Sequence, residues 1–214
     1  MLEELRSYSK YLALVVAIVG LFKYKDYAHT KAKYFLFSVW YIVFTEFLGT
    51  YFYKWFDMLN YPVYNTYRLV QLTFYLWWIR LLLQSVVKRK ILAGFIVVSV
   101  LAHLIDNIFI HSFLYESATY GNTLSVIFVA ISICLYIVEQ FNSEKVLTIT
   151  SSKYFWFLIG VLIFNVTYLP FKIAFKYFIF GDIRPLSVVN FILCVILYSC
   201  FLVGFLKAKP TDVD

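Results

Sequence analysis

Long apolar stretches alternate along the chain with short polar ones. Seven apolar segments can be marked, each close to the length of about 20 residues that an α-helix needs to cross a bilayer. The apolar runs are continuous, with no residue-by-residue alternation, and are about twice as long as a strand of a membrane barrel. They therefore predict helices and no strands. The predicted segments are 6–23, 34–54, 64–86, 91–111, 122–141, 154–174 and 186–206.

Composition places these helices in a membrane. Hydrophobic residues make up 63% of the 214 positions and charged residues only 14%, whereas soluble domains carry about 25% charged residues. A soluble chain with so little charge could not cover its surface. Tyr34, Trp55 and Tyr154 flank segments in the way that aromatic residues mark membrane interfaces. We expect residues 1–214 to form one domain, an all-α membrane protein with a single bundle of seven transmembrane helices.

The distribution of Lys and Arg predicts how the bundle is inserted. Eleven basic residues flank the segments on one side: Lys23, Lys25, Lys31, Lys33, Lys88, Arg89, Lys90, Lys145, Lys153, Lys207 and Lys209. Six flank them on the other side: Arg6, Lys10, Lys54, Lys172, Lys176 and Arg184. Basic residues concentrate on the cytoplasmic side of a membrane, so the N-terminus is predicted outside and the C-terminus in the cytoplasm.

Polar side chains inside the apolar segments gather mostly toward the predicted outer face. Hydrophilic groups in hydrocarbon are costly, so they tend to face a bundle interior or a wet cavity and to mark function. With the predicted orientation, we expect these side chains to line a polar pocket that opens away from the cytoplasm. The pocket residues are Glu46, Asn65, Arg68, Gln71, His103, Asp106, Asn107, Asn122, Asn165 and Asn190.

A plainer explanation stands beside the pocket. Amide side chains such as Gln71, Asn165 and Asn190 often hold membrane helices together through hydrogen bonds worth about 0.6–2 kcal/mol each. Glu46 and Arg68 lie at matching depths and could form an ion pair. Such a pair would be structural or part of a ligand site, and the sequence leaves both readings open.

Metal and covalent chemistry are not expected. His103 and Asp106 lie one helical turn apart, but His111 is about 12 Å further along the axis than His103, so one ion could not bind both histidines directly. The three cysteines form no C-x-x-C pair, which disfavours a zinc site or a disulfide framework. The chain contains no G-x-S-x-G motif and no glycine-rich phosphate loop. We therefore assign no catalytic residue, no metal and no cofactor.

Short motifs resemble a known family. Val63-Tyr64-Asn65-Thr66-Tyr67, followed by Gln71, is similar to the V-Y-x-x-Y-x-x-x-[EQ]-F start of the third helix in a largely uncharacterised family of small bacterial seven-helix integral membrane proteins. Thr45-Glu46, Gly121-Asn122 and Lys153-Tyr154-Phe155-Trp156 resemble short motifs in its second, fifth and sixth helices. Gln71 stands where that family often has an acidic residue. The resemblance covers most of the chain and implies a multi-pass protein of the bacterial cytoplasmic membrane, without implying an activity.

Together these patterns favour a ligand-binding or sensory membrane protein and disfavour an enzyme. Only eight residues follow Leu206, so a sensor would need a separate cytoplasmic signalling partner. Two alternatives stay open: an intramembrane lipid-modifying enzyme that uses Glu46 or Asp106, and a small transporter, which the apolar inner half disfavours. The expected surroundings are the lipid bilayer, because the basic residues lie in short clusters that suit membrane insertion better than nucleic-acid binding. The oligomeric state is left open.

Overall fold

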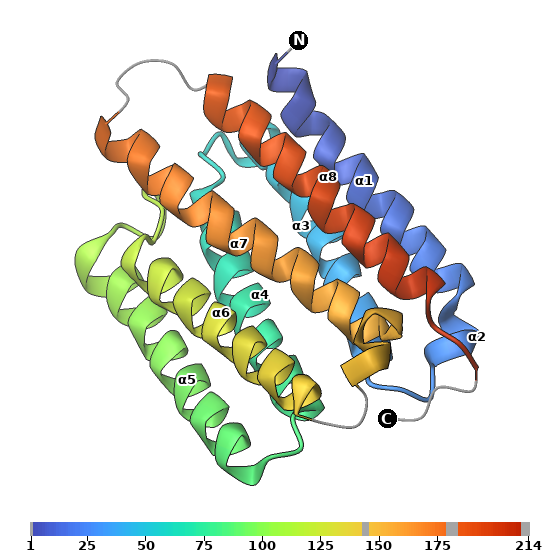
Figure 1. The fold of residues 1–214 in the computed structure, drawn as a ribbon. Helices are drawn as coiled ribbons and strands as arrows, with labels where there is room; N and C mark the ends of the chain where they lie inside the picture. The colour runs from blue at the N-terminus through green and yellow to red at the C-terminus, as the bar shows by residue number, and fades with distance from the viewer. Residues whose placement is uncertain (1, 143–145, 179–183, 211–214) are drawn as a thin grey trace. The chain divides into compact units, whose positions relative to one another are not determined.

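Long helices make up most of the computed structural model, which describes residues 2–142, 146–178 and 184–210 (Figure 1). No strand occurs in these three ranges, which confirms the prediction of an all-helical chain. Two short elements are not α-helices: η1 is a π-helix and η2 is a 3-10 helix. In chain order the elements are α1 (Leu2–Phe22), α2 (Tyr24–Tyr27), α3 (Ala32–Phe56), α4 (Tyr61–Leu82), α5 (Val86–Ile105), η1 (Asp106–Ile110), α6 (Tyr120–Phe141), η2 (Val146–Ser151), α7 (Lys153–Phe178) and α8 (Arg184–Leu206).

Several helices are long and apolar enough to cross a membrane, as expected of a multi-pass membrane protein. Among the described residues there are five such stretches: Ala32–Phe52, Val86–Ile110, Tyr120–Phe141, Lys153–Phe171 and Ser187–Leu206. The apolar stretch of α1, Tyr8–Phe22, is shorter, and α4 carries Arg68 and Arg80 within its length. A total of seven spans, and their orientation, stay predictions.

The turn between α4 and α5 lies earlier than the sequence predicts. We expected Lys88, Arg89 and Lys90 to form it, but the structure places them within the first five residues of α5. Leu83 and Ser85 have extended backbone conformations, and the Ser85 side chain accepts a hydrogen bond from the Lys88 amide. Serine favours this capping position, and the cap starts the helix before the basic cluster.

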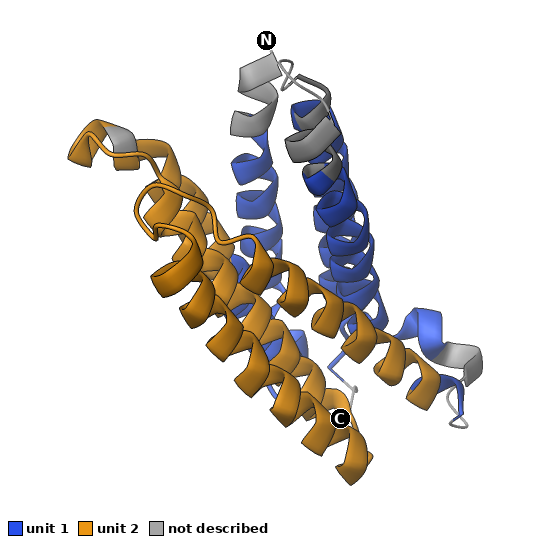
Figure 2. Cartoon of the chain, turned by 90° about the vertical axis from the view of Figure 1, so that its left-hand side faces the viewer, with its two compact units in different colours: residues 1–39, 140–214 blue, residues 40–139 orange. Residues whose placement is uncertain are grey.

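The chain divides into two compact units, described here one at a time (Figure 2). Unit 1 comprises residues 1–39 and 140–214, and within it α8 packs along both α1 and α7. Its core is aromatic: the rings of Phe35 and Phe157 stack with centroids 4.2 Å apart, and Phe205 meets Phe157 edge-on at 4.9 Å. Gly204 permits this packing, because a Cβ there would collide with the Phe157 ring.

Tyr27 lies outside the apolar stretches and ties α2 to α1. Its side chain is fully buried, and its hydroxyl donates a hydrogen bond to the Gly20 carbonyl at 2.5 Å. Burial raises the pKa of Tyr27 above its ordinary value, with a smaller contribution from neighbouring Tyr24. The folded protein therefore holds this proton to higher pH than the unfolded chain does.

This difference predicts a loss of stability in alkali that depends on Tyr27. Stability from the neutral phenol is fully present below pH 10 and falls as pH rises above 10, where only the unfolded chain releases the proton. Between pH 10 and 11 the wild-type protein should lose about 1 kcal/mol more than Tyr27→Phe, which has no proton to release there. Thermal unfolding in detergent across this range measures the difference. Parallel pH profiles for the two proteins would contradict it.

Unit 2 comprises residues 40–139, and so contains α3 from Trp40 onward, α4, α5, η1 and α6. The helices α5 and α6 lie side by side (Figure 1), and the rings of Phe95 and Phe128 stack between them at 4.3 Å. Near the start of α5, the ammonium of Lys88 lies 3.1 Å from the Glu139 carboxylate, which also accepts a hydrogen bond from the Gln84 amide. At the other end of α5, the backbones of Gly121 and His103 come into close contact.

Candidate functional site

The ten residues predicted to line a pocket fall in both units. Asn165 and Asn190 belong to unit 1, and both are half-buried. The Asn165 amide donates to the Val161 carbonyl of its own helix at 2.8 Å. The other eight belong to unit 2 and lie on α3, α4, α5, η1 and α6: Glu46, Asn65, Arg68, Gln71, His103, Asp106, Asn107 and Asn122. That all ten line one pocket stays a prediction.

Asp106 is the most deeply buried of the polar residues predicted for the site. It has no exposed surface, yet both carboxylate oxygens have partners. His111 Nδ1 donates to Oδ1 at 2.6 Å, and the Gly121 amide donates to Oδ2 at 2.8 Å. Gly121 lies in the first turn of α6, where amide groups have no partner within their own helix. A carboxylate from another element supplies that partner, and its charge suits the positive end of the helix dipole.

A change of helix type brings His111 to Asp106. From Asp106 the chain continues as a π-helix, in which the His111 amide donates to the Asp106 carbonyl, five residues back, at 2.8 Å. An α-helix joins residues four apart and would have directed the two side chains differently. The prediction of the site therefore omitted His111, and it omitted Gly121 because a glycine has no polar side chain. The only trace in the sequence is the five-residue spacing of Asp106 and His111.

Asn65 anchors the loop that follows the π-helix. The side chain is buried, its amide donates to the carbonyls of Phe113 and Glu116 at 3.0 and 2.8 Å, and its oxygen accepts from the Ala118 amide at 3.1 Å. All three of its partners are backbone groups of the connection between η1 and α6. Asn65 therefore has a structural role that accounts for its polarity.

His103 presents a different arrangement, because one of its ring nitrogens has no partner. Nδ1 lies 3.0 Å from the Ser99 carbonyl and 3.3 Å from the Ser125 hydroxyl. A carbonyl only accepts, so the proton belongs on Nδ1 and a neutral ring presents Nε2 as an acceptor. His103 is 1% exposed, and no described residue hydrogen-bonds to Nε2. Arg68 is close enough to act on this ring electrostatically.

Two residues near His103 in the chain, one on α5 and one on η1, share this feature. Within the described part of the chain, the Ser99 hydroxyl and the Asn107 amide oxygen are buried and accept or donate no hydrogen bond. Ser99 and His103 lie four residues apart on one face of α5, and Asn107 follows four residues later in η1, which continues α5. We call these three residues the α5 polar column. The Asn107 amide nitrogen is bonded, since it donates to the His103 carbonyl at 2.8 Å.

Glu46 and Tyr64 meet where α3 packs on α4. The Tyr64 hydroxyl donates to the Glu46 carboxylate at 3.4 Å. Gly49 makes room for this tyrosine, because a Cβ at that position would lie 2.8 Å from the hydroxyl oxygen. The Glu46–Arg68 ion pair stays a prediction. Gln71 and Asn122 are buried, and Gln71 hydrogen-bonds Tyr75 one turn along α4.

These side chains form no obvious metal centre. Over the described ranges, no three His, Cys, Asp or Glu residues gather closely enough to hold an ion. The chemistry that the residues can perform is hydrogen bonding to a polar molecule through the α5 polar column and proton transfer through His111. Comparison of the chain with protein-family models, with curated proteins and with solved structures finds no match.

Proposed function

We propose that the protein is a ligand-binding, sensory membrane protein whose polar ligand binds at the α5 polar column of unit 2. One observation carries the proposal: Nε2 of His103 is buried with no hydrogen-bond partner among the described residues. An unsatisfied buried polar group costs about 1–3 kcal/mol. A ligand that donates a hydrogen bond to Nε2 would recover this free energy on binding.

The rest of the column supports the same reading. The Ser99 hydroxyl and the Asn107 side-chain oxygen are also buried without a hydrogen-bond partner among the described residues, and they lie four residues before and after His103. A ligand with several hydroxyl or amine groups would match this row, whereas an apolar one would not. With the predicted orientation, the site opens on the non-cytoplasmic side. Signal output through a separate cytoplasmic partner is part of the proposal.

Cysteine labelling tests whether the column is reached by water-soluble molecules. In a protein whose three native cysteines are replaced by alanine, His103→Cys should react with a membrane-impermeant methanethiosulfonate reagent added outside the cell. Leu101→Cys is the matched control, because Leu101 lies on the same helix but is 52% exposed on its outer surface, where lipid would keep the thiol unreactive. An unreactive His103→Cys, or reaction only from the cytoplasmic side, would refute the proposed site.

A second candidate, a lipid-modifying enzyme, is favoured by the Asp106–His111 pair. Asp106 holds the Nδ1 proton of His111, and the histidine is 16% exposed. Its Nε2 could then accept a proton from a water molecule that attacks a lipid ester. Asp106 would orient the base, since both of its own oxygens are already engaged. Unchanged lipid composition in cells that carry only His111→Gln would exclude this candidate.

A further inference from the structure

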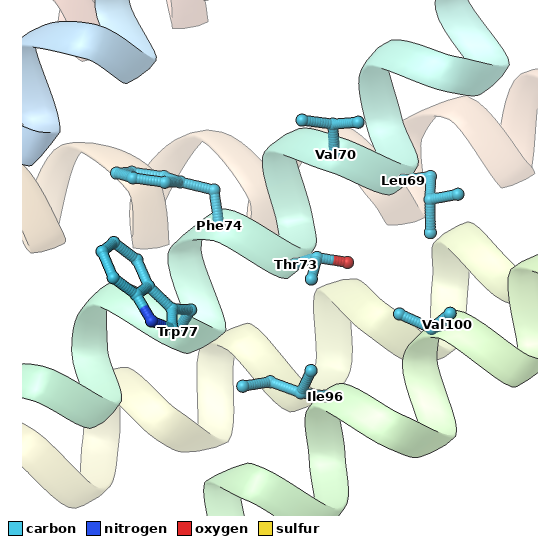
Figure 3. Close-up of a pocket in the computed structure, with 7 residues that line it drawn as sticks. All are labelled: Leu69, Val70, Thr73, Phe74, Trp77, Ile96 and Val100. Carbon is cyan, nitrogen blue, oxygen red and sulfur yellow. The ribbon is translucent and has the colours of Figure 1, made fainter.

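An apolar groove runs between α4 and α5 (Figure 3). It has a volume of about 440 Å³ and is open at the protein surface. Side chains from both helices form its walls, and none of them belongs to the predicted pocket. The groove is lined by Leu69, Val70, Thr73, Phe74, Trp77, Ile96 and Val100.

The groove leads toward two arginines. Arg80 comes three residues after Trp77, and Arg89 comes seven residues before Ile96, so both lie on the helix faces that line the groove. Along the axes these separations are about 4.5 and about 10.5 Å, and because the helices are antiparallel both point to the same end. The side chain of Arg80 reaches across to α5, where its Nε donates to the Arg89 carbonyl at 3.2 Å.

In both arginines only the Nε atom donates one of the hydrogen bonds described here. Arg89 Nε donates to the Leu83 carbonyl at 2.8 Å. In the described part of the chain, neither arginine forms an ion pair with a carboxylate, so their Nη groups can bind an anion. The adjacent Lys88 differs, because its charge is already compensated by Glu139 at 3.1 Å. Two uncompensated guanidinium groups therefore stand at the end of an apolar groove.

We propose that this groove binds one anionic glycerophospholipid, with an acyl chain between α4 and α5 and the phosphate at Arg80 and Arg89. The apolar walls match a hydrocarbon chain, and guanidinium groups bind phosphate oxygens with paired hydrogen bonds. Charge complementarity selects an anionic lipid over a zwitterionic one. In the predicted orientation the arginines lie on the cytoplasmic side, whose leaflet supplies anionic lipid. This lipid site is independent of the α5 polar column.

Native mass spectrometry of the full-length protein tests the site, with dioleoyl phosphatidylglycerol and dioleoyl phosphatidylcholine as probes. Phosphatidylglycerol should bind more tightly, and Arg80→Gln and Arg89→Gln should each weaken its binding about fivefold, from the contribution of one basic group near a lipid headgroup. Val100→Phe should also weaken binding, because the larger ring fills the groove. Arg89→Lys should restore part of the affinity, since it keeps the charge.

Two control variants distinguish lipid binding in the groove from a general effect of surface charge or side-chain size. Lys90→Gln removes the same charge from the next residue of α5, and Val97→Phe adds the same ring at a position that is 57% exposed and outside the groove. Neither should change phosphatidylglycerol binding. The proposal is overturned if Lys90→Gln weakens binding as much as Arg89→Gln, if Val100→Phe binds like wild type, or if the two lipids bind equally. Helical content by circular dichroism confirms that each variant is folded.

Discussion

Replacement of Gly121 by alanine is expected to destabilise the protein by about 3 kcal/mol, at the upper end of what overpacking a core costs. An added Cβ would lie 2.7 Å from Cα and 2.9 Å from the amide nitrogen of His103. These are backbone atoms of α5, so no side-chain rotation can relieve the contact and the helices would have to separate. Separation would also stretch the hydrogen bond from the Gly121 amide to Asp106.

Gly94 provides the matched control for this change. It lies in the middle of α5, and a Cβ there would meet nothing within 4 Å. Gly94→Ala should therefore leave stability unchanged or raise it by up to about 1 kcal/mol, because alanine is the better helix former. Thermal unfolding of the two variants in the same detergent measures the contrast. Equal stability of Gly121→Ala and Gly94→Ala would show that α5 and α6 do not approach closely at Gly121.

Asp106→Ala is expected to cost about 3 kcal/mol, the upper end of the cost of leaving a buried hydrogen-bond donor without a partner. The alanine cannot accept the hydrogen bonds that Asp106 receives from His111 and Gly121. The Gly121 amide is buried at the start of α6 and would lose its partner. We expect the junction of η1 and α6 to loosen first, and limited proteolysis of the 111–119 connection should detect this.

Asp106→Asn distinguishes the charge of this residue from its hydrogen bonds. The asparagine oxygen can still accept from the Gly121 amide, and its NH₂ group can donate to a His111 Nδ1 that carries no proton. The expected loss is therefore smaller, about 1–2 kcal/mol, which is the difference between charged and neutral hydrogen bonds. If Asp106→Asn and Asp106→Ala unfold at the same temperature, the negative charge of Asp106 carries the whole effect. If neither variant is destabilised, the junction does not depend on Asp106.

Hydropathy alone located the helices of this protein. The segments chosen as apolar runs each coincide with a long helix, and their ends differ from the observed ones by only a few residues. When η1 is counted as the continuation of α5, the largest shift is at the start of α5, where the Ser85 cap begins the helix before the basic residues. Capping depends on one side chain and one amide, and a hydropathy pattern averaged over a span does not contain it.

The sequence also singled out buried polar residues such as Asn65 and Asp106, but not their hydrogen-bond partners. Asn65 and Asp106 were expected to face a shared pocket. In the structure their hydrogen bonds go to backbone amides and carbonyls and to His111. Backbone groups carry no signature in the sequence, so their need for a partner could not be foreseen. The unsatisfied Nε2 of His103 likewise becomes visible only when every neighbour is in place.

By itself the sequence determined that this is a helical chain rich in membrane-length apolar stretches, because transfer from water to hydrocarbon depends on composition summed along about 20 residues. Only the tertiary structure decided that His111 hydrogen-bonds Asp106 and that Arg80 and Arg89 lie at one end of an apolar groove. Those contacts depend on how each helix is rotated and where it changes from an α-helix to a π-helix. A rotation of one residue redirects a side chain by about 100°, and hydropathy does not register it.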